Sequence, residues 1–419
     1  MAFFKQTVKD LPLIRGDHTR VLVRVDYNVP LKDGKVSDDL RIRASLPTLE
    51  YLLEHGCSLV LISHLGRPDG ERKLEYSLEP VAKYLSKLLK KDVTFVDDIV
   101  GDLAYQTVKK SKNGDIIMLQ NLRFDPGEEE NDAKFAKGIA RVARADYFVQ
   151  DGFAVVHRAH ASTDAITNEI PGVAGFLLER EYTTISDAME APKRPFVAVL
   201  GGAKVSDKIQ VVERFVKLAD TVLIGGAMAN TFLKYKGASV GKSKVEDDQQ
   251  ATLDGIYAAA KAKAGDRVDD YVVTPVDVAV AQEFSDKAPR ELRKIGEVKD
   301  DDIALDIGDE TIEKFCKVLE GAGTVIWNGP LGMAEFPNFA HGSARVALTL
   351  ATHPKVTSIV GGGDTADFVL KWDVKKGGSF THVSTGGGAG LDLMAGKKLP
   401  GVECLLDADT RRRKEIKLN

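Results

Sequence analysis

Short apolar segments of four or five residues recur along the first half of the chain, separated by longer segments in which apolar residues return with helical spacing. The short segments lie at Val21–Val25, Leu59–Ser63, Val93–Val96, Ile116–Gln120 and Tyr147–Gln150, and the longer ones include Leu78–Leu89 and Asp132–Ala143. Apolar strands that alternate with amphipathic helices are typical of a parallel sheet with helices on both faces.

The same alternation starts again after a helical stretch at Glu179–Glu190 and the proline-containing sequence Ala191–Pro195. Its short apolar segments lie at Phe196–Leu200, Thr221–Ile224, Tyr271–Thr274, Thr324–Trp327, Thr357–Val360 and His382–Ser384. The pattern predicts an α/β protein with two Rossmann-like domains, each a parallel sheet with helices on both faces, joined by a hinge helix. We place the first domain at 1–180, the hinge helix and linker at 181–195, the second domain at 196–398, and a C-terminal segment at 399–419.

Length, charge and cysteine usage narrow the class of protein. The 419 residues suffice for two domains with their own cores, and a net charge of −4 gives no general attraction to nucleic acid or anionic membranes. The three cysteines are far apart, which supports neither a disulfide framework nor a zinc site. The chain shows no signal-peptide pattern and no apolar run of the ~18 residues that span a bilayer, so we expect a cytoplasmic protein. The basic tail Thr410–Asn419 is typical of a solvated chain end.

Polar side chains follow the predicted strands of the first half. Ligands of open parallel sheets bind beyond the carboxyl ends of the strands, so these positions are candidates for a binding site. Taken singly, each arginine is commonly a surface salt-bridge partner, and each histidine a partly buried, hydrogen-bonded side chain. Several cations at one sheet edge would repel one another unless an anion binds there, and arginine suits both phosphate and carboxylate. The candidates are Asp26, Asn28, His64, Arg67, Arg123, His157, Arg158 and His160, with Arg41 in the helical stretch Asp39–Leu53.

Glycine pairs and triplets follow the predicted strands of the second half. Glycine lets the backbone approach a ligand closely, and backbone N–H groups at a helix N-terminus form an anion site. One such turn carries little weight, because tight turns use glycine anyway, but four at the same end of one sheet indicate a nucleotide platform. They are Gly201-Gly202, Gly225-Gly226, Gly361-Gly362-Gly363 and Gly386-Gly387-Gly388.

Charged residues near these glycines sharpen the interpretation. Lys204 and Lys208 lie four residues apart, so at the start of a helix they would project from one face toward phosphate oxygens; a solvated helix face is the alternative. Asp364 beside a phosphate site would hold a cation, which we expect to be Mg²⁺. Glu335 could accept hydrogen bonds from ribose hydroxyls or be an exposed loop carboxylate. The sequence Gly237–Ser243 is not a phosphate-binding P-loop, because three residues separate its glycines where four are required.

Taken together, these residues resemble phosphoglycerate kinases. The matching stretches appear in the order of that family and cover nearly the whole chain to about Leu405. They read Arg24-Val-Asp-Tyr-Asn-Val-Pro, Ser63-His-Leu-Gly-Arg-Pro, Glu75-Tyr-Ser-Leu-Glu-Pro-Val-Ala, Gln120-Asn-Leu-Arg-Phe, His157-Arg-Ala-His, Leu200-Gly-Gly-Ala-Lys-Val-Ser-Asp-Lys, Trp327-Asn-Gly-Pro-Leu-Gly, Gly361-Gly-Gly-Asp-Thr and Ser384-Thr-Gly-Gly-Gly-Ala.

The resemblance implies Mg²⁺-dependent, reversible phosphoryl transfer between 1,3-bisphosphoglycerate with ADP and 3-phosphoglycerate with ATP, in glycolysis and gluconeogenesis. It implies small-molecule substrates, no nucleic-acid or membrane partner, a monomer, and hinge closure between a substrate domain and a nucleotide domain. The C-terminal segment Leu399–Leu405 would pack back on the first domain.

The resemblance also implies a role for each candidate residue. The 3-phosphoglycerate site would be formed by Asp26, Asn28, Arg41, His64, Arg67, Arg123 and Arg158. The nucleotide site would be formed by Lys204, Lys208, Gly308, Asn328, Glu335, Gly362, Gly363, Asp364 and Thr365, with Asp364 as the magnesium ligand. Arg41 and Lys204 would stabilise the transferring phosphoryl group, and the backbone around Gly386 and Gly387 would assist them.

One loop departs from the family, and two alternative functions stay open. The family usually has Asn-Asp-Ala-Phe-Gly before its His-Arg-Ala-His, whereas this chain has Gln150-Asp-Gly-Phe-Ala154 followed by Val155 and Val156. The first alternative is a kinase with the same scaffold and a different carboxylate acceptor. The second is a nucleotide-binding or regulatory protein without turnover, which the presence of Arg41 and Lys204 disfavours.

Overall fold

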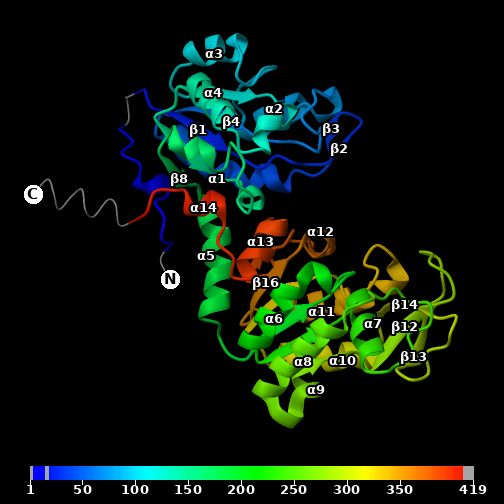
Figure 1. The fold of residues 1–419 in the computed structure, drawn as a ribbon. Helices are drawn as coiled ribbons and strands as arrows, with labels where there is room; N and C mark the ends of the chain where they lie inside the picture. Colours follow the sequence, from blue (N-terminus) through cyan, green and yellow to red (C-terminus); the bar gives the residue numbers. More distant parts are fainter. Residues whose placement is uncertain (1–2, 15–17, 409–419) are drawn as a thin grey trace, which may run out of the picture. The chain divides into compact units, whose positions relative to one another are not determined.

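The chain divides into two compact units in the computed structural model, which describes residues 3–14 and 18–408 (Figure 1). Unit 1 contains Met1–Thr183 and Lys398–Asn419, and unit 2 contains Thr184–Lys397. The chain passes from the first unit to the second within helix α5 (Phe176–Glu190). The basic tail Thr410–Asn419 lies outside the described residues.

Unit 1 is built on a parallel sheet that has six strands within the described part of the chain, in the order β5-β6-β4-β1-β7-β8. Strand β1 pairs with β4 on one side and with β7 on the other, so the chain order reverses at β1. Ligands of open α/β sheets bind at the carboxyl end of such a switch point. The strands are β1 (Arg20–Arg24), β4 (Ser58–Ile62), β5 (Val93–Val96), β6 (Ile116–Leu119), β7 (Tyr147–Gln150) and β8 (Gly172–Ala174).

Helices bury both faces of this sheet. Every position of β1 and β4 is buried, as expected for parallel strands covered on both sides. Ile42 of α1 and Leu85 of α2 belong to one core cluster with Val21 of β1. Helix α4 contacts β1, and its Ile139 is fully buried, as is Leu22 on the other face of β1. The helices are α1 (Leu40–Glu54), α2 (Glu79–Leu89), α3 (Asp102–Lys109) and α4 (Ala133–Ala143).

Described residues near the start of the chain contact a segment from its C-terminal part in unit 1. Lys5 is 5% exposed, and its ammonium group donates hydrogen bonds to the carbonyl oxygens of Glu403 (2.7 Å) and Leu405 (2.9 Å). A third bond runs to the Asp407 carboxylate, also at 2.7 Å. Helix α14 (Pro400–Glu403) lies in the segment that this ammonium group holds.

The loop after β7, where the sequence departs from the family pattern, contacts two other parts of unit 1. The Asp151 carboxylate accepts a hydrogen bond from the backbone N–H of Leu177 (2.9 Å), in the first turn of α5. Burial raises the pKa of Asp151 to about 7. The carbonyl oxygen of Val156 accepts a hydrogen bond from the N–H of Gly401 (2.9 Å), so the C-terminal segment docks on this loop.

Unit 2 is built on a second parallel sheet, with six strands in the described residues and the order β11-β10-β9-β15-β16-β17. This is the strand order of Rossmann folds, and its switch point lies between β9 and β15, which pair with each other. The strands are β9 (Phe196–Leu200), β10 (Thr221–Ile224), β11 (Val272–Val273), β15 (Thr324–Asn328), β16 (Thr357–Gly361) and β17 (His382–Val383).

The helices of unit 2 also cover both faces. Phe315 of α10, Val346 of α11 and Val369 of α12 share a core cluster with Trp327 of β15. Helix α6 contacts β9 and β10 and places the Phe215 ring 5.9 Å from that of Phe196. The helices are α6 (Ile209–Leu218), α7 (Gly226–Tyr235), α8 (Gln250–Ala264), α9 (Val268–Tyr271), α10 (Asp309–Glu320), α11 (His341–Thr352), α12 (Gly363–Trp372) and α13 (Gly387–Met394).

The expected fold class is confirmed, with additions that the sequence pattern did not predict. An antiparallel sheet joins β12 (Asp277–Ala281), β13 (Glu291–Lys294) and β14 (Ile303–Ile307), and a short hairpin joins β2 (Leu31–Lys32) to β3 (Lys35–Val36). The strand expected at Tyr271–Thr274 is shorter, because Tyr271 ends α9. Of the helices in the described residues, none is both long enough and apolar enough to cross a bilayer.

Replacing Lys5 by methionine removes the buried ammonium group and leaves the carbonyl oxygens of Glu403 and Leu405 without their donor. We expect Lys5→Met to lower the free energy of unfolding by about 2–4 kcal/mol, measured by urea denaturation. Lys9→Met is the matched control, because Lys9 is 61% exposed and lies 3.6 Å from Glu179. A Lys5→Met protein as stable as the control would show that the hydrogen bonds of the Lys5 ammonium group contribute little to the free energy of unfolding.

Candidate active site

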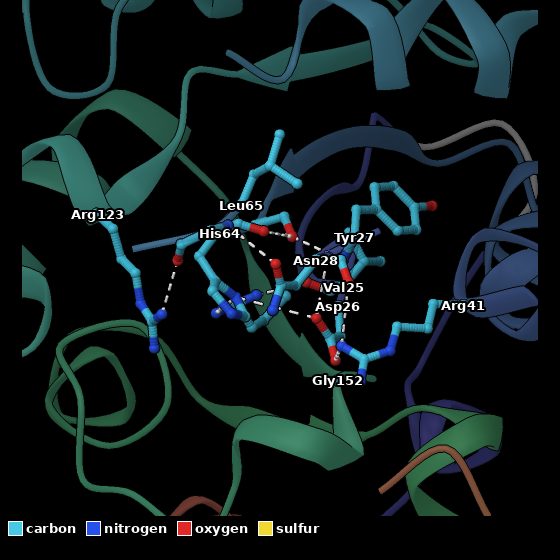
Figure 2. Close-up of polar contacts among 12 residues, drawn as sticks. Val25, Asp26, Tyr27, Asn28, Arg41, His64, Leu65, Arg123 and Gly152 are labelled. Carbon is cyan, nitrogen blue, oxygen red and sulfur yellow. Dashed lines mark hydrogen bonds and ion pairs between the residues drawn. The ribbon is translucent and has the colours of Figure 1, made fainter. Parts of the chain in front are cut away.

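The carboxyl end of β1 gathers three of the candidate residues of unit 1 (Figure 2). Arg41, from the first turn of α1, donates a hydrogen bond to the Asp26 carboxylate (2.8 Å) and another to the carbonyl oxygen of Asn28 (3.3 Å). The side-chain oxygen of Asn28 accepts the backbone N–H of Gly66 (2.9 Å), which ties the end of β1 to the loop after β4. Asp26 is buried and Arg41 is about one-third exposed, so the guanidinium group can still reach a ligand.

His64 lies at the end of β4 and is held in one tautomer. Arg24 donates a hydrogen bond to its Nδ1 atom at 3.1 Å, and because arginine has no acceptor, Nδ1 is unprotonated and Nε2 carries the hydrogen. Burial, together with the positive charges of Arg24, Arg123 and Arg41, lowers the pKa of His64 well below 6.5. His64 is therefore a neutral hydrogen-bond donor near pH 7.

Three arginines are clustered near this edge. Arg123 follows β6, is 5% exposed, and donates a hydrogen bond to the carbonyl oxygen of Gly66 (2.9 Å), with Glu129 3.2 Å away. Burial lowers the pKa of Arg123, and Arg158 and Arg67 lower it further by repulsion, which places these two exposed side chains near it. A cluster of like charges of this kind favours a multiply charged anion.

A buried network under the cluster was not among the predicted site residues. Arg24 is 1% exposed, donates to the hydroxyl of Ser162 (2.8 Å), and lies 3.9 Å from the fully buried Glu128 carboxylate. Glu128 also accepts the hydroxyl (2.6 Å) and the backbone N–H (3.0 Å) of Ser162. His160 lies at the edge of this network, and burial and the neighbouring arginines lower its pKa to about 4. His157 lies in the same loop and is partly exposed.

The strand ends of unit 2 are packed backbone against backbone, which is why glycine is required there. A Cβ atom at Gly201 would lie 2.2 Å from the carbonyl oxygen of Pro330, and one at Gly329 would lie 2.1 Å from that of Gly201. Gly329 also has a φ of 104°, which disfavours other residues. These glycines therefore serve the contact between β9 and β15 as well as any ligand.

The arrangement expected for Lys204 and Lys208 is wrong. The two residues do not lie on one face of a helix: Lys204 is in the loop after β9, Lys208 ends a single 3₁₀ turn at Ser206–Lys208, and α6 begins at Ile209. Lys208 instead turns back to the strand ends, where it donates to the carbonyl oxygens of Gly201 (2.8 Å) and Asn328 (3.1 Å). Burial lowers its pKa to about 8, against the opposing effects of Asp364 and Asp207.

Two adjoining cavities open at the strand ends of unit 2. The larger has a volume of about 600 Å³ and apolar walls that include Leu305 and Met333, with Glu335 and Asp364 among its polar residues. The smaller has a volume of about 260 Å³ and shares Asp364 with it. Its polar and glycine lining includes Lys204, Lys208, Asn328, Gly362, Gly363 and Thr365.

The smaller cavity carries features that point to an anion. Gly362 (φ 86°) and Gly363 line the cavity at the start of α12, and no described side chain caps this helix N-terminus, which leaves its N–H groups for a ligand. Asn328 is 1% exposed, yet neither atom of its side-chain amide has a hydrogen-bond partner among the described residues. The Thr365 hydroxyl accepts the N–H of Gly329 (2.7 Å), so this side chain also supports the cavity wall.

The two predicted glycines Gly387 and Gly308 have different surroundings. Gly387 has a φ of 49° and open space in front of its Cα, so its backbone is accessible at the start of α13. Gly308 precedes α10, and a Cβ atom there would lie 2.2 Å from the Asp277 side chain. Gly308 therefore packs closely against Asp277, and its expected nucleotide contact stays a prediction.

The comparison with protein families identifies the chain. The model named "Phosphoglycerate kinase" matches residues 10–397. The chain belongs to the phosphoglycerate kinase family. The phosphoglycerate kinase of Moorella thermoacetica is 48% identical over 403 residues, which cover 96% of this chain and 99% of that protein. That of Thermosipho africanus is 47% identical over 404 residues, which cover 95% and 97%.

Solved phosphoglycerate kinases have the same fold. The structure from Coxiella burnetii matches with a TM-score of 0.83 and 37% identity, covering 97% of this chain and 99% of that one. The structure from Pyrococcus horikoshii OT3 matches with a TM-score of 0.80 and 34% identity, covering 96% and 98%. The resemblance expected from the motifs is confirmed, and as a family member the chain is an enzyme, a kinase of glycolysis.

The network around His64 predicts its titration. In ¹⁵N-resolved NMR spectra, we expect the Nε2–H tautomer to persist as the pH falls below 6.5, because protonation would place a further cation among the arginines. Arg24→Met should raise the pKa of His64, since it removes both the hydrogen bond to Nδ1 and a positive charge. A His64 signal that titrates near 6.5 in the unmodified protein would contradict this.

Proposed function

We propose that this enzyme transfers a phosphoryl group reversibly between ATP and the carboxylate of 3-phosphoglycerate, giving ADP and 1,3-bisphosphoglycerate. The observation that carries the proposal is the cationic edge of unit 1, where Arg41 and Arg123 lie with a neutral, donating His64. Such an edge suits a small molecule that bears both a phosphate and a carboxylate. Arg67 and Arg158, both exposed near Arg123, would complete the site together with Asp26 and Asn28.

The cavities of unit 2 support a nucleotide as the second substrate. The apolar walls of the larger cavity suit a purine base, and Glu335 could accept hydrogen bonds from ribose hydroxyls. The smaller cavity suits phosphates, because its lysines, the uncapped N-terminus of α12 and the unpartnered Asn328 amide all offer hydrogen-bond donors. Binding of a phosphate oxygen would give the Asn328 amide the partner that it lacks.

Asp364 fits the magnesium ion that such a nucleotide would bring. The described residues contain no cluster of three side chains suited to hold a metal alone. Mg²⁺ commonly binds through one or two carboxylates together with substrate phosphates and water, and Asp364 lines both cavities. When bound, the ion would neutralise charge on the nucleotide phosphates.

The transfer needs no general base, because the acceptor is already a carboxylate. Its oxygen attacks the γ-phosphorus of ATP, the bond from that phosphorus to the β–γ bridging oxygen breaks, and the electron pair leaves with ADP. Catalysis of this step is mainly positioning and charge stabilisation. We assign these roles to Arg41 and Lys204, assisted by the backbone around Gly386 and Gly387 at the start of α13, where the N–H of Gly386 donates to the Ser384 hydroxyl (3.1 Å).

We further propose that the two sites meet through motion about α5, the helix that links the units. Closure would exclude water, which would otherwise hydrolyse the acyl phosphate. We propose a cytoplasmic monomer that acts on small molecules and has no nucleic-acid or membrane partner, in keeping with the glycolytic family and a net charge of −4.

The function is tested by incubating the purified protein with Mg·ATP and 3-phosphoglycerate and trapping the acyl phosphate with hydroxylamine. Hydroxamate should form when both substrates and Mg²⁺ are present and not when any one is omitted. Hydroxamate with other carboxylates but not with 3-phosphoglycerate would favour a kinase with a different acceptor. Nucleotide binding without any product would favour a protein that has lost turnover.

Loss of either assigned cation should slow the same reaction. Arg41→Ala and Lys204→Ala should each lower kcat by about 10²–10³-fold, the usual cost of removing one group that stabilises transition-state charge. The matched controls are Arg43→Ala, an exposed neighbour of Arg41 on α1 that bonds to Asp39 (2.6 Å), and Lys217→Ala on α6. Wild-type kcat in Arg41→Ala or Lys204→Ala would overturn that residue's assignment.

A further inference from the structure

The loop that carries Lys204 is held by a single distant carboxylate, that of Glu246. Its Oε2 atom accepts the backbone N–H groups of Val205 (2.8 Å) and Ser206 (3.0 Å), and Oε1 accepts the Ser206 hydroxyl. These are the two residues that follow Lys204: Val205 precedes the 3₁₀ turn, Ser206 begins it, and α6 follows at Ile209. A carboxylate that binds three donors within two residues fixes the direction of the backbone there.

Glu246 is itself firmly placed. Its backbone N–H donates to the Thr231 hydroxyl of α7 (3.1 Å). Two residues earlier, the carbonyl oxygen of Lys244 accepts the side chain of Asn230, also in α7 (3.1 Å). Lys242 donates its backbone N–H to the carbonyl oxygen of Asp302 (2.8 Å). The segment 242–246 is therefore anchored on α7 and on the turn before β14.

The same segment borders the larger cavity, because Lys242 and Lys244 belong to its lining. Lys204 lines the smaller cavity, together with Asn328 and Asp364. One short segment thus connects the wall of the proposed base pocket with the loop that presents a cation to the proposed phosphate pocket.

The electrostatics of Glu246 agree with a charged, hydrogen-bonded carboxylate. Burial alone would raise its pKa, but the hydrogen bonds from Ser206 and Val205 and the nearby charge of Lys204 lower it. Without this acceptor, the N–H groups of residues 205 and 206 would need other partners. Extending α6 toward Lys204 would not supply them, because the first four N–H groups of a helix have no partner within it, so the direction of this backbone depends on Glu246.

We propose that Glu246 is a positioning residue for phosphoryl transfer: it holds the loop 204–206 so that Lys204 faces the smaller cavity. This inference rests on the proposed function, in which Lys204 stabilises the transferring group. Glu246 itself is absent from the lining of both cavities. Its effect on the reaction passes through Lys204, which separates it from a residue that merely stabilises the fold.

The test is a double-mutant cycle between positions 246 and 204, read as kcat and KM in the hydroxamate assay. We expect Glu246→Ala to lower kcat about 10–100-fold, as small misplacement of a catalytic group does, with KM for 3-phosphoglycerate changed less than about twofold. In a Lys204→Ala background, the same substitution should change kcat less than about twofold, because no cation is left to position. Glu246→Gln, which keeps one acceptor oxygen, should retain more activity than Glu246→Ala.

The matched control is Asp247→Ala, which removes an adjacent, exposed carboxylate that lies 3.3 Å from Lys234. It should leave kcat unchanged. Circular dichroism melts of each variant report on folding. If Glu246→Ala does not fold, Glu246→Gln and Ser206→Ala carry the same cycle, each with a smaller expected loss of kcat that disappears in the Lys204→Ala background.

The outcomes separate this inference from the function on which it rests. Wild-type kcat in Glu246→Ala, with a strongly reduced Lys204→Ala, would overturn the positioning role and leave the function intact. Equal losses from Glu246→Ala with and without Lys204 would also overturn it, because the effect would then not pass through that lysine. Full activity of Lys204→Ala would overturn both the assignment of Lys204 and the positioning role.

Discussion

Repulsion among the arginines at the carboxyl edge of the first sheet determines which charged groups can lie around them. Arg24, Arg41 and Arg123 lie close enough to His64 to lower its pKa, and an edge of this kind is stable without a ligand only if part of the repulsion is relieved. Each of these arginines has a carboxylate beside it, namely Glu128 for Arg24, Asp26 for Arg41 and Glu129 for Arg123, and His64 stays neutral. The remaining positive charge is left for an anion. The cost of assembling the cluster is thus also the source of its preference for a phosphorylated carboxylate.

In the second unit, the main structural feature is that backbone N–H donors lie close together at the strand ends. The ends of β9 and β15 approach so closely at Gly201 and Gly329 that side chains are excluded, and Lys208 turns inward to satisfy two carbonyl oxygens there. The uncapped N-terminus of α12 lies beside this packing, because the N–H of Gly329 donates to the Thr365 hydroxyl. Donors fixed in this way need little rearrangement when a phosphate arrives.

Periodicity was sufficient to predict both parallel sheets, and the residues at the strand ends included several that line the smaller cavity, such as Lys204, Lys208 and Asp364. They failed for features that have a weak sequence pattern or that depend on residues far apart in the chain. Strand β13 (Glu291–Lys294) is mostly exposed and polar, so it has no apolar pattern. Lys204 and Lys208 were placed on one helix face, although the loop is held open by Glu246, 41 residues from Val205. Glu128 lies 34 residues from its partner Ser162, and only the fold brings such pairs together.

The contact between the segments around Lys5 and Leu406 affects the order in which the two units fold during synthesis. At the edge of the first sheet, the N–H of Leu406 donates to the carbonyl oxygen of Gly172 in β8 (2.9 Å). The Lys5 ammonium group donates to the carbonyl oxygen of the preceding residue, Leu405. This segment is synthesised after Thr184–Lys397, which form one continuous unit. Domains usually mature in the order of their synthesis. Here the unit that is begun first is finished last, so a nascent chain stalled before its end would carry a complete second unit beside an incomplete first one.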